Sequence, residues 1–397
     1  PIETPHLEYA EILIKQGSEE IQKELYRFKD HGERDVALRF DLTVPLARFI
    51  SQHKGELGLP FKRYAYGNVF RGERAQRGRY REFTQCDFDF IGSNSTYADA
   101  ETIMVIYHSL KKIGIEKFCI SINNRKIMNG ICEQIGASNN IESILRIIDK
   151  IDKIGEESVK NELINEVGLD KKDVDFLIDF INIKDDEKDS TILIDKILKL
   201  SKNEKIIQGI KEIKEVLVHL KSANIAKNHY KIDLSIARGL GYYTGIVYET
   251  FLDDKRDIGS ISSGGRYDNL TSTFSKEEMS GVGASIGIDR LMVALTEDGD
   301  IKDTTAVALI VPICEGGFGF AIECGMFFRD NKIDIEIFPE INKPKKGLNY
   351  AHKKGHRFAI IIGEDEMRDK KITLKDLVSG EQRSMLTIEE ALSIVVC

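Results

Sequence analysis

An arginine-rich turn lies between two strand-like runs in the first quarter of the chain. From Lys62 to Arg81 there are seven basic residues and one acidic residue, Glu73, although the whole chain has a formal net charge of -8. Because this local charge opposes the global charge, the pattern favours an anion site over a merely solvated surface. We therefore predict a hairpin that grips phosphate; a solvated hairpin with a charged outer face is the alternative.

The strand that follows the turn carries ligand groups on one face. Side chains alternate between the two faces of a strand. A guanidinium, an aromatic ring, an amide and two carboxylates on one face can hold a phosphate, a purine, an ammonium and a basic ring. That face consists of Arg81, Phe83, Gln85, Asp87 and Asp89, and the opposite face, a possible core, consists of Glu82, Thr84, Cys86, Phe88 and Phe90.

Another polar segment, residues 38–45, reads as a strand with Arg39, Asp41 and Thr43 on one face. Asp41 can accept a hydrogen bond from an ammonium group. We expect these side chains to face a ligand together.

Two glycine-interrupted segments, residues 236–245 and 262–268, are candidate ligand-facing loops. The first carries Arg238 and Tyr243, and the second carries Tyr267, whose hydroxyl can meet a polar ring. Missing Cβ atoms let a backbone or a ligand approach closely. Taken singly, each segment is equally well explained as an ordinary turn.

Residues 281–290 form a glycine-rich strand that leads into a helix with Arg290 near its start. The segment lacks the full G-x-G-x-x-G spacing of a dinucleotide fingerprint. An arginine at a helix start can instead reach a triphosphate, with help from the positive end of the helix dipole.

The composition is that of a globular protein, with 42% hydrophobic and 31% charged residues. No apolar run approaches the roughly 20 residues of a membrane span, and no signal-peptide pattern opens the sequence, so we expect a cytoplasmic protein. Six cysteines without a C-x-x-C pair indicate neither a zinc site nor a disulfide framework. No metal ion held by the protein alone is expected.

The length of 397 residues suggests two or three domains, and the patterns divide the chain into four parts. Residues 1–123 and 227–300 are rich in strand patterns and glycine. Residues 124–226 are rich in Lys, Glu, Asp and Ile with helical spacing, which predicts an all-helical insertion. Residues 304–397 alternate strands and helices, which predicts an α/β layer with a largely parallel sheet. No glycine-rich phosphate loop follows its first strand, so a docking module is favoured there.

Together these segments resemble the histidyl-tRNA synthetases, which are class II aminoacyl-tRNA synthetases, over essentially the whole chain. Residues 61–92 resemble class II motif 2, residues 281–295 resemble motif 3, and the Arg238 and Tyr267 segments resemble two signatures of the histidine enzymes. The resemblance implies an α+β fold: an antiparallel catalytic sheet flanked by helices, an all-helical insertion and a C-terminal α/β anticodon-binding domain. It also implies ATP-dependent ligation of L-histidine to tRNA(His) through a histidyl-adenylate, with ATP and Mg²⁺, by a homodimer.

The resemblance further implies roles for particular side chains. The expected catalytic residues are Arg71, Arg238 and Arg290. Histidine would be bound by Asp41, Thr43, Gln85, Asp89, Arg238, Tyr243 and Tyr267. ATP would be bound by Arg71, Glu73, Arg79, Phe83 and Arg290, and the tRNA acceptor end by Arg74 and Gln76.

Two departures from the family pattern bear on these expectations. Gly241 stands where the family usually has an aspartate. The chain also starts at Pro1, within the part that resembles the end of motif 1. By family analogy roughly 40 residues that build much of the dimer interface would precede it, so we expect a trimmed terminus and a weaker dimer.

A non-catalytic histidine-sensing paralogue, such as the regulatory subunit of ATP phosphoribosyltransferase, is the main alternative. That class is expected to lack both the Arg238 signature and the anticodon-binding domain, and this chain has both patterns. An RNA-sensing domain attached to a kinase would need kinase motifs, which residues 1–397 do not contain.

Overall fold

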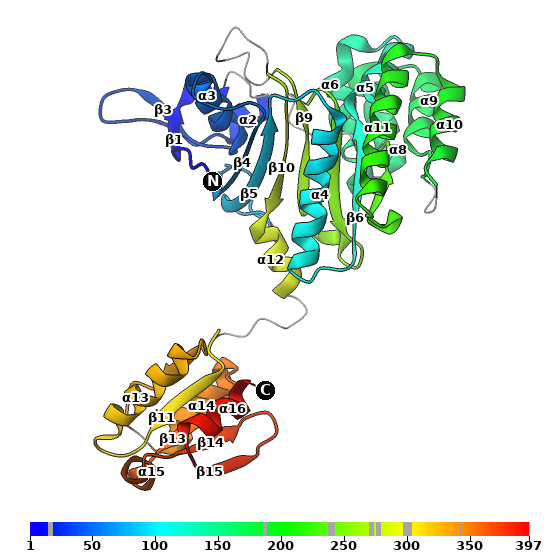
Figure 1. Ribbon diagram of the computed structural model, residues 1–397. Helices are drawn as coiled ribbons and strands as arrows, with labels where there is room; N and C mark the ends of the chain where they lie inside the picture. The colour runs from blue at the N-terminus through cyan, green and yellow to red at the C-terminus, as the bar shows by residue number, and fades with distance from the viewer. Residues whose placement is uncertain are drawn as a thin grey trace. The chain divides into compact units, whose positions relative to one another are not determined.

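A computed structural model describes residues 1–14, 19–185, 189–236, 243–269, 274, 279–296, 304–341 and 343–396. The chain forms two compact units, Pro1–Ala294 and Leu295–Cys397 (Figure 1). No helix within the described ranges is both long and apolar enough to span a bilayer.

The first unit combines sheets with many helices. Its strands are β1 (Leu7–Tyr9), β2 (Arg27–Lys29), β3 (Asp35–Leu38), β4 (Phe61–Phe70), β5 (Glu82–Ile91), β6 (Phe118–Asn124), β7 (Tyr230–Ile232), β8 (Ile246–Leu252), β9 (Ser262–Tyr267) and β10 (Gly281–Gly287). Its α-helices are α1 (Ala10–Ile14), α2 (Glu19–Glu24), α3 (Thr43–His53), α4 (Thr96–Lys112), α5 (Arg125–Gln134), α6 (Ile141–Ile148), α7 (Ile151–Ile154), α8 (Glu156–Glu162), α9 (Lys171–Ile181), α10 (Thr191–Leu200) and α11 (Glu204–Ser222), and α12 (Ile288–Thr296) ends it. Short helical turns are η1 (Ser138–Asn140), η2 (Leu163–Val167), η3 (Lys227–His229) and η4 (Arg256–Ile258).

The main sheet has the strand order β4-β5-β10-β9-β8-β6-β7, and only the β6–β7 pair is parallel. β4 and β5 pair in continuous register from Phe61 opposite Ile91 to Phe70 opposite Glu82. The arginine-rich turn therefore joins two antiparallel strands, which confirms the predicted hairpin. A smaller sheet has the order β1-β3-β2.

Helix α4 packs against β5, β9 and β10 (Figure 1). Ser95 accepts a hydrogen bond from the backbone N–H of Tyr97 and so caps the first turn of the helix. Inside this interface the fully buried Asp99 lies 2.6 Å from Nη2 of Arg266 on β9. Burial raises the pKa of Asp99 to about 6, and the hydrogen bond from Arg266 opposes that shift. The pair ties the helix to the sheet because neither charge can be left alone at this depth.

The described elements between β6 and β7 are all helices, joined by short turns, as the apolar spacing predicts. Ile144, Leu145 and Ile148 of α6 are buried, and so are Ile206 and Ile213 of α11. Helix α11 packs against both α5 and α4. The apolar stripes therefore join the helices to one another and to the layer that covers the sheet.

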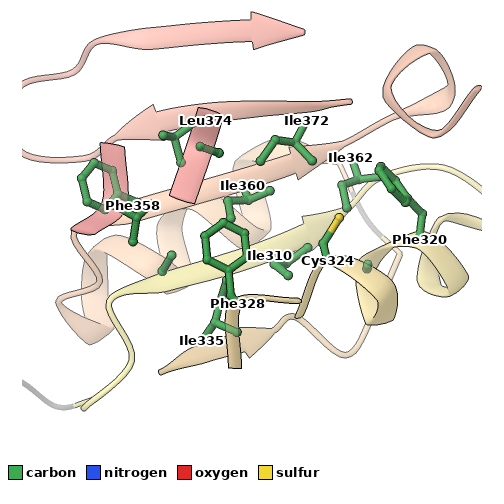
Figure 2. Packing of buried hydrophobic residues seen from close by; sticks show 14 residues of the cluster. Ile310, Phe320, Cys324, Phe328, Ile335, Phe358, Ile360, Ile362, Ile372 and Leu374 are labelled. Carbon is green, nitrogen blue, oxygen red and sulfur yellow. The ribbon is translucent and has the colours of Figure 1, made fainter. Parts of the chain in front are cut away.

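The second unit has one sheet with the order β12-β11-β13-β14-β15. Residues of β11 alternate between two cores: Ala308 and Ile310 face the cluster in Figure 2, and Leu309 and Val311 face a smaller cluster. Both faces of this strand are thus covered. The elements are β11 (Ala308–Pro312), α13 (Gly317–Asp330), β12 (Ile335–Ile337), α14 (Pro344–Lys354), β13 (Phe358–Ile362), α15 (Glu364–Asp369), β14 (Ile372–Asp376), β15 (Gln382–Leu386) and α16 (Ile388–Val396).

The structure corrects three sequence expectations. The second sheet is mixed, because β11 pairs parallel with β12 and β13 while β13–β14 and β14–β15 are antiparallel. Residues 363–371 are too few for a crossover between parallel strands, which needs about a dozen residues. Residues 38–45 are not a strand, since β3 ends at Leu38 and α3 begins at Thr43. Residues 262–267 are a strand, β9, and not a turn.

Candidate active site

A cavity of about 760 Å³ opens over the main sheet of the first unit. Its lining brings together segments that are far apart in the chain. All the described residues that the sequence assigns to histidine or ATP lie on it: Asp41, Thr43, Arg71, Glu73, Arg79, Phe83, Gln85, Asp89, Tyr243, Tyr267 and Arg290. Arg238 and Gly241 fall outside the described residues.

The cavity has two chemically different ends. We call the buried group of Asp41, Gln85, Asp87, Asp89 and Tyr267 the acidic end. The arginine end consists of Arg71, Glu73, Arg79, Phe83 and Arg290.

Asp89 of β5 is held on two sides at the acidic end. The hydroxyl of Tyr267 donates a hydrogen bond to its Oδ1, and Nε of Arg63 on β4 lies 2.9 Å from its Oδ2. Burial raises the pKa of Asp89, and the charge of Arg63 opposes this. The carboxyl group therefore has a fixed position from which it can accept from a ligand N–H.

Gly283 on β10 makes room for this carboxyl group. It lies directly opposite Asp89 in the antiparallel register. A Cβ atom at this position would be 2.1 Å from Oδ1 of Asp89. Only glycine permits this approach, which explains one of the glycines in the strand.

Asp41 acts at the start of α3. Its Oδ1 accepts from the backbone N–H groups of Thr43 and Val44 at 3.0 and 2.8 Å. These bonds satisfy two of the N–H groups that a helix start leaves unpaired. They also explain why the chain leaves the extended conformation here. Burial raises the pKa of Asp41 even so.

Asp87 lies between Gln85 and Asp89 on the same face of β5 and lines the cavity. Alternation along the strand placed it on the predicted ligand face, but no particular role in binding histidine or ATP was assigned to it. Burial raises its pKa to about 7, and Arg63 opposes that shift. Nε2 of Gln85 donates to Oγ of Ser285, which lies opposite Asp87 on β10.

At the arginine end, Arg71 lies between two aromatic rings. Its guanidinium carbon is 4.4 Å from the ring centroid of Phe40 and 5.0 Å from that of Phe83, and Nε donates to the carbonyl of Phe40. Such stacking fixes the direction of the guanidinium group.

Arg290, in the first turn of α12, contacts the turn of the β4–β5 hairpin. Its Nη1 donates to the carbonyl of Ser260, and its side chain lies against Gly78 of the turn. Arg79 is 3.1 Å from Glu73 across the hairpin. The arginine end can therefore hold a polyanion between β5 and α12.

The tip of the hairpin extends beyond the cavity. Gln76 and Arg79 exchange backbone hydrogen bonds, and Gly78 takes a φ of +68° that favours glycine. Arg74 and Gln76 are exposed and do not line the cavity. They remain available to a large partner such as a nucleic acid.

The helical segment also contributes to the cavity wall, which the sequence did not predict. Its charged residues there are Arg125, Glu142, Arg146, Asp149 and Lys153. Nothing in the spacing of α6 and α7 distinguishes these charges from those of a solvated helix face.

The whole chain is similar to known proteins. The family model described as histidyl-tRNA synthetase matches residues 1–291, and the model described as anticodon binding domain matches residues 308–397. A histidine–tRNA ligase of Helicobacter hepaticus is 57% identical, covering all of this chain and 90% of that protein. One from Wolinella succinogenes is 56% identical with the same coverage. The crystal structure of histidyl-tRNA synthetase from Nostoc sp. PCC 7120 has a TM-score of 0.85 and 35% identity, covering all of this chain and 90% of that one.

Proposed function

Since this chain belongs to the histidyl-tRNA synthetase family, we propose that it attaches L-histidine to tRNA(His) through a histidyl-adenylate formed from ATP. The observation that carries the proposal is the convergence of the predicted histidine and ATP residues on one cavity with an acidic end and an arginine end. The acidic end suits a cationic amino acid, and the arginine end suits a triphosphate.

Histidine binds at the acidic end. Its ammonium group meets Asp41, Thr43 and Gln85, and its imidazole lies between Asp89 and Tyr243, with Tyr267 beside it. A side chain of similar size without ring nitrogens would leave these buried polar groups unpaired, which is worth about 10⁴ in selectivity.

ATP binds at the arginine end. Phe83 stacks on the adenine, Arg71 meets the α-phosphate and Arg290 holds the triphosphate, with Arg79 and Glu73 supporting the hairpin. A carboxylate oxygen of histidine attacks the α-phosphorus, the bond to the β-phosphate oxygen breaks, and diphosphate leaves. Positive charge held in a fixed position accelerates such a step, so Arg238 acts by stabilising negative charge on the α-phosphate.

Mg²⁺ fits this site as a partner of the ATP phosphates. Among the described residues no group of three or more His, Cys, Asp or Glu side chains is arranged to hold a metal ion unaided. Mg²⁺ is commonly bound by one or two carboxylates together with substrate phosphates, and Glu73 and Glu249 on the cavity wall supply carboxylate oxygens. The ion would neutralise phosphate charge there.

Transfer to tRNA(His) uses parts outside the cavity. Arg74 and Gln76 at the hairpin tip meet the acceptor end, and residues 304–397 dock the anticodon. The catalytic domain is formed by residues 1–123 and 227–300, with residues 124–226 as its insertion. The enzyme works as a homodimer in the cytoplasm.

Histidine-dependent exchange between ATP and labelled diphosphate tests the first step, and charging of tRNA(His) tests the second. We expect both activities, with exchange lost when histidine is omitted. Histidine binding without either activity would instead support the regulatory class. That class is disfavoured, because relatives that match the full chain are named histidine–tRNA ligases.

A further inference from the structure

The three buried carboxyl groups of the acidic end differ in how far their oxygens are already engaged. Asp89 is held by Tyr267 and Arg63, and Oδ1 of Asp41 accepts from two backbone N–H groups at the start of α3. Ser285 hydrogen-bonds the carboxyl group of Asp87, but its Oδ1 is buried and has no hydrogen-bond partner among the described residues. Asp87 is 3% exposed and lines the cavity.

A second acceptor without a partner lies two residues away on the same face. Oε1 of Gln85 is buried and likewise has no hydrogen-bond partner in the described part of the chain, because the amide uses its nitrogen to bind Ser285. Both residues line the cavity. Two buried acceptors on the same face of one strand can be satisfied by a cationic group that carries several N–H donors.

We infer that Asp87, together with Oε1 of Gln85, is a further acceptor for the α-ammonium group of histidine, beside Asp41. This inference rests on the proposed histidine ligation and adds a residue that the family resemblance did not supply. An ammonium group has three N–H donors, so it can satisfy both orphan oxygens and still reach Asp41.

The charge around Asp87 agrees with a cationic ligand. The charged groups that act on it are Asp41 before α3, Asp89 on β5, Arg63 on β4 and Arg39 after β3. Two of these are carboxyl groups, which together with burial raise the pKa of Asp87 to about 7. A bound ammonium lowers that pKa, so histidine binding should strengthen as the pH rises through about 7.

Three ligands separate the possible roles of Asp87. Histidine carries ammonium, carboxylate and imidazole groups; histamine lacks the carboxylate, and imidazolepropionate lacks the ammonium. Asp87→Asn keeps the shape and removes the charge, so it should weaken histidine and histamine by about 10- to 100-fold and leave imidazolepropionate within about two-fold. Asp89→Asn is the matched variant on the same strand and should weaken all three ligands.

Calorimetry with each ligand gives the affinities, and ATP affinity and thermal melting check the fold. Equal weakening of all three ligands by Asp87→Asn, or no weakening of any, would overturn the inference. Asp87→Glu restores the carboxylate and should therefore recover part of the affinity for histidine. If Asp87 had only a structural role, the affinities for all three ligands would change alike.

The wild-type protein offers a measurement that does not depend on variant folding. Near pH 6, where Asp87 is mostly protonated, binding of histidine should release more protons than binding of imidazolepropionate, after correction for the imidazole pKa of each free ligand. Calorimetry in two buffers of different ionisation enthalpy measures this release, and equal release contradicts the inference. Absence of histidine-dependent exchange in the wild type would refute the proposed function, whereas normal exchange with equal proton release would refute only the role of Asp87.

Discussion

The acidic end and the arginine end of the cavity differ in charge and in their exposure to solvent. At the acidic end, Asp87 and Asp89 are 3% and 6% exposed, and burial raises their pKa values. At the arginine end, the side chains of Arg79 and Glu73 keep 34% and 19% of their exposure. The side chains of the acidic end are shielded from solvent and held by buried partners. Those of the arginine end are more exposed and are held by ring stacking and by the hairpin.

This difference has consequences for energetics. A charge-assisted hydrogen bond at the acidic end is worth roughly 1.5 to 3 kcal/mol, and a partly exposed ion pair about 0 to 1 kcal/mol. Substitutions at the acidic end should therefore change ligand choice sharply. Single substitutions of supporting residues at the arginine end should change ligand choice little.

The largest expected effect concerns Arg238, which lies outside the described residues. The family resemblance assigns it to the α-phosphate that the histidine carboxylate attacks. Arg238→Ala should lower histidine-dependent diphosphate exchange by about 10² or more, the usual scale for one preorganised charge donor. ATP affinity should change only modestly. Near wild-type exchange in a folded variant would remove Arg238 from the mechanism.

The next effect tests the acidic end alone. Asp89→Asn should raise the KM for histidine by about 10- to 100-fold, because it weakens a charge-assisted bond and leaves Arg63 without its buried partner. The KM for ATP should stay within about three-fold. Steady-state exchange with each substrate varied in turn measures both values, and equal changes would mean that the two ends are not independent.

The hairpin tip should show a smaller effect, confined to the tRNA step. Gln76→Ala should slow transfer of histidine to tRNA(His) by about 10-fold, the scale of one base contact, and leave adenylate formation unchanged. Single-turnover transfer from preformed adenylate measures this, with Arg74→Ala as the neighbouring comparison. Equal losses in both steps would place the tip in ATP binding.

The smallest effect is expected at the ion pair across the hairpin. Glu73→Gln should raise the KM for ATP by no more than about five-fold, because the pair with Arg79 is partly exposed and screened. Raising the salt concentration should shrink the difference further. A loss as large as that of Asp89→Asn would show that the arginine end is as shielded from solvent as the acidic end.

Much of this site could be predicted from local patterns. Alternation along β5 placed Phe83, Gln85 and Asp89 on one face, and the glycine-rich strand before Arg290 was recognisable from residue types. These features depend on neighbours along the chain, which the sequence displays directly.

Other features depend on pairings between distant residues. Asp89 and Tyr267 are 178 positions apart, and their contact requires β5, β10 and β9 to lie in that order. Asp41 was assigned to a strand because its segment alternates, yet its carboxyl group starts α3. Asp87 stands out only after the partners of its two neighbouring carboxyl groups are known. Charges of α6 could not be assigned to the cavity wall without the packing of that helix.

Gly283 also limits how this enzyme can be re-engineered. The proposed recognition of histidine at the acidic end depends on the missing side chain of Gly283, since a Cβ atom there would lie 2.1 Å from Oδ1 of Asp89. A library that diversifies β10 to accept N-alkylated histidine analogues must therefore keep glycine at this position. Space for a larger ring has to come from another residue of the cavity, such as Ser285, which lies opposite Asp87 and not opposite Asp89 in the strand register.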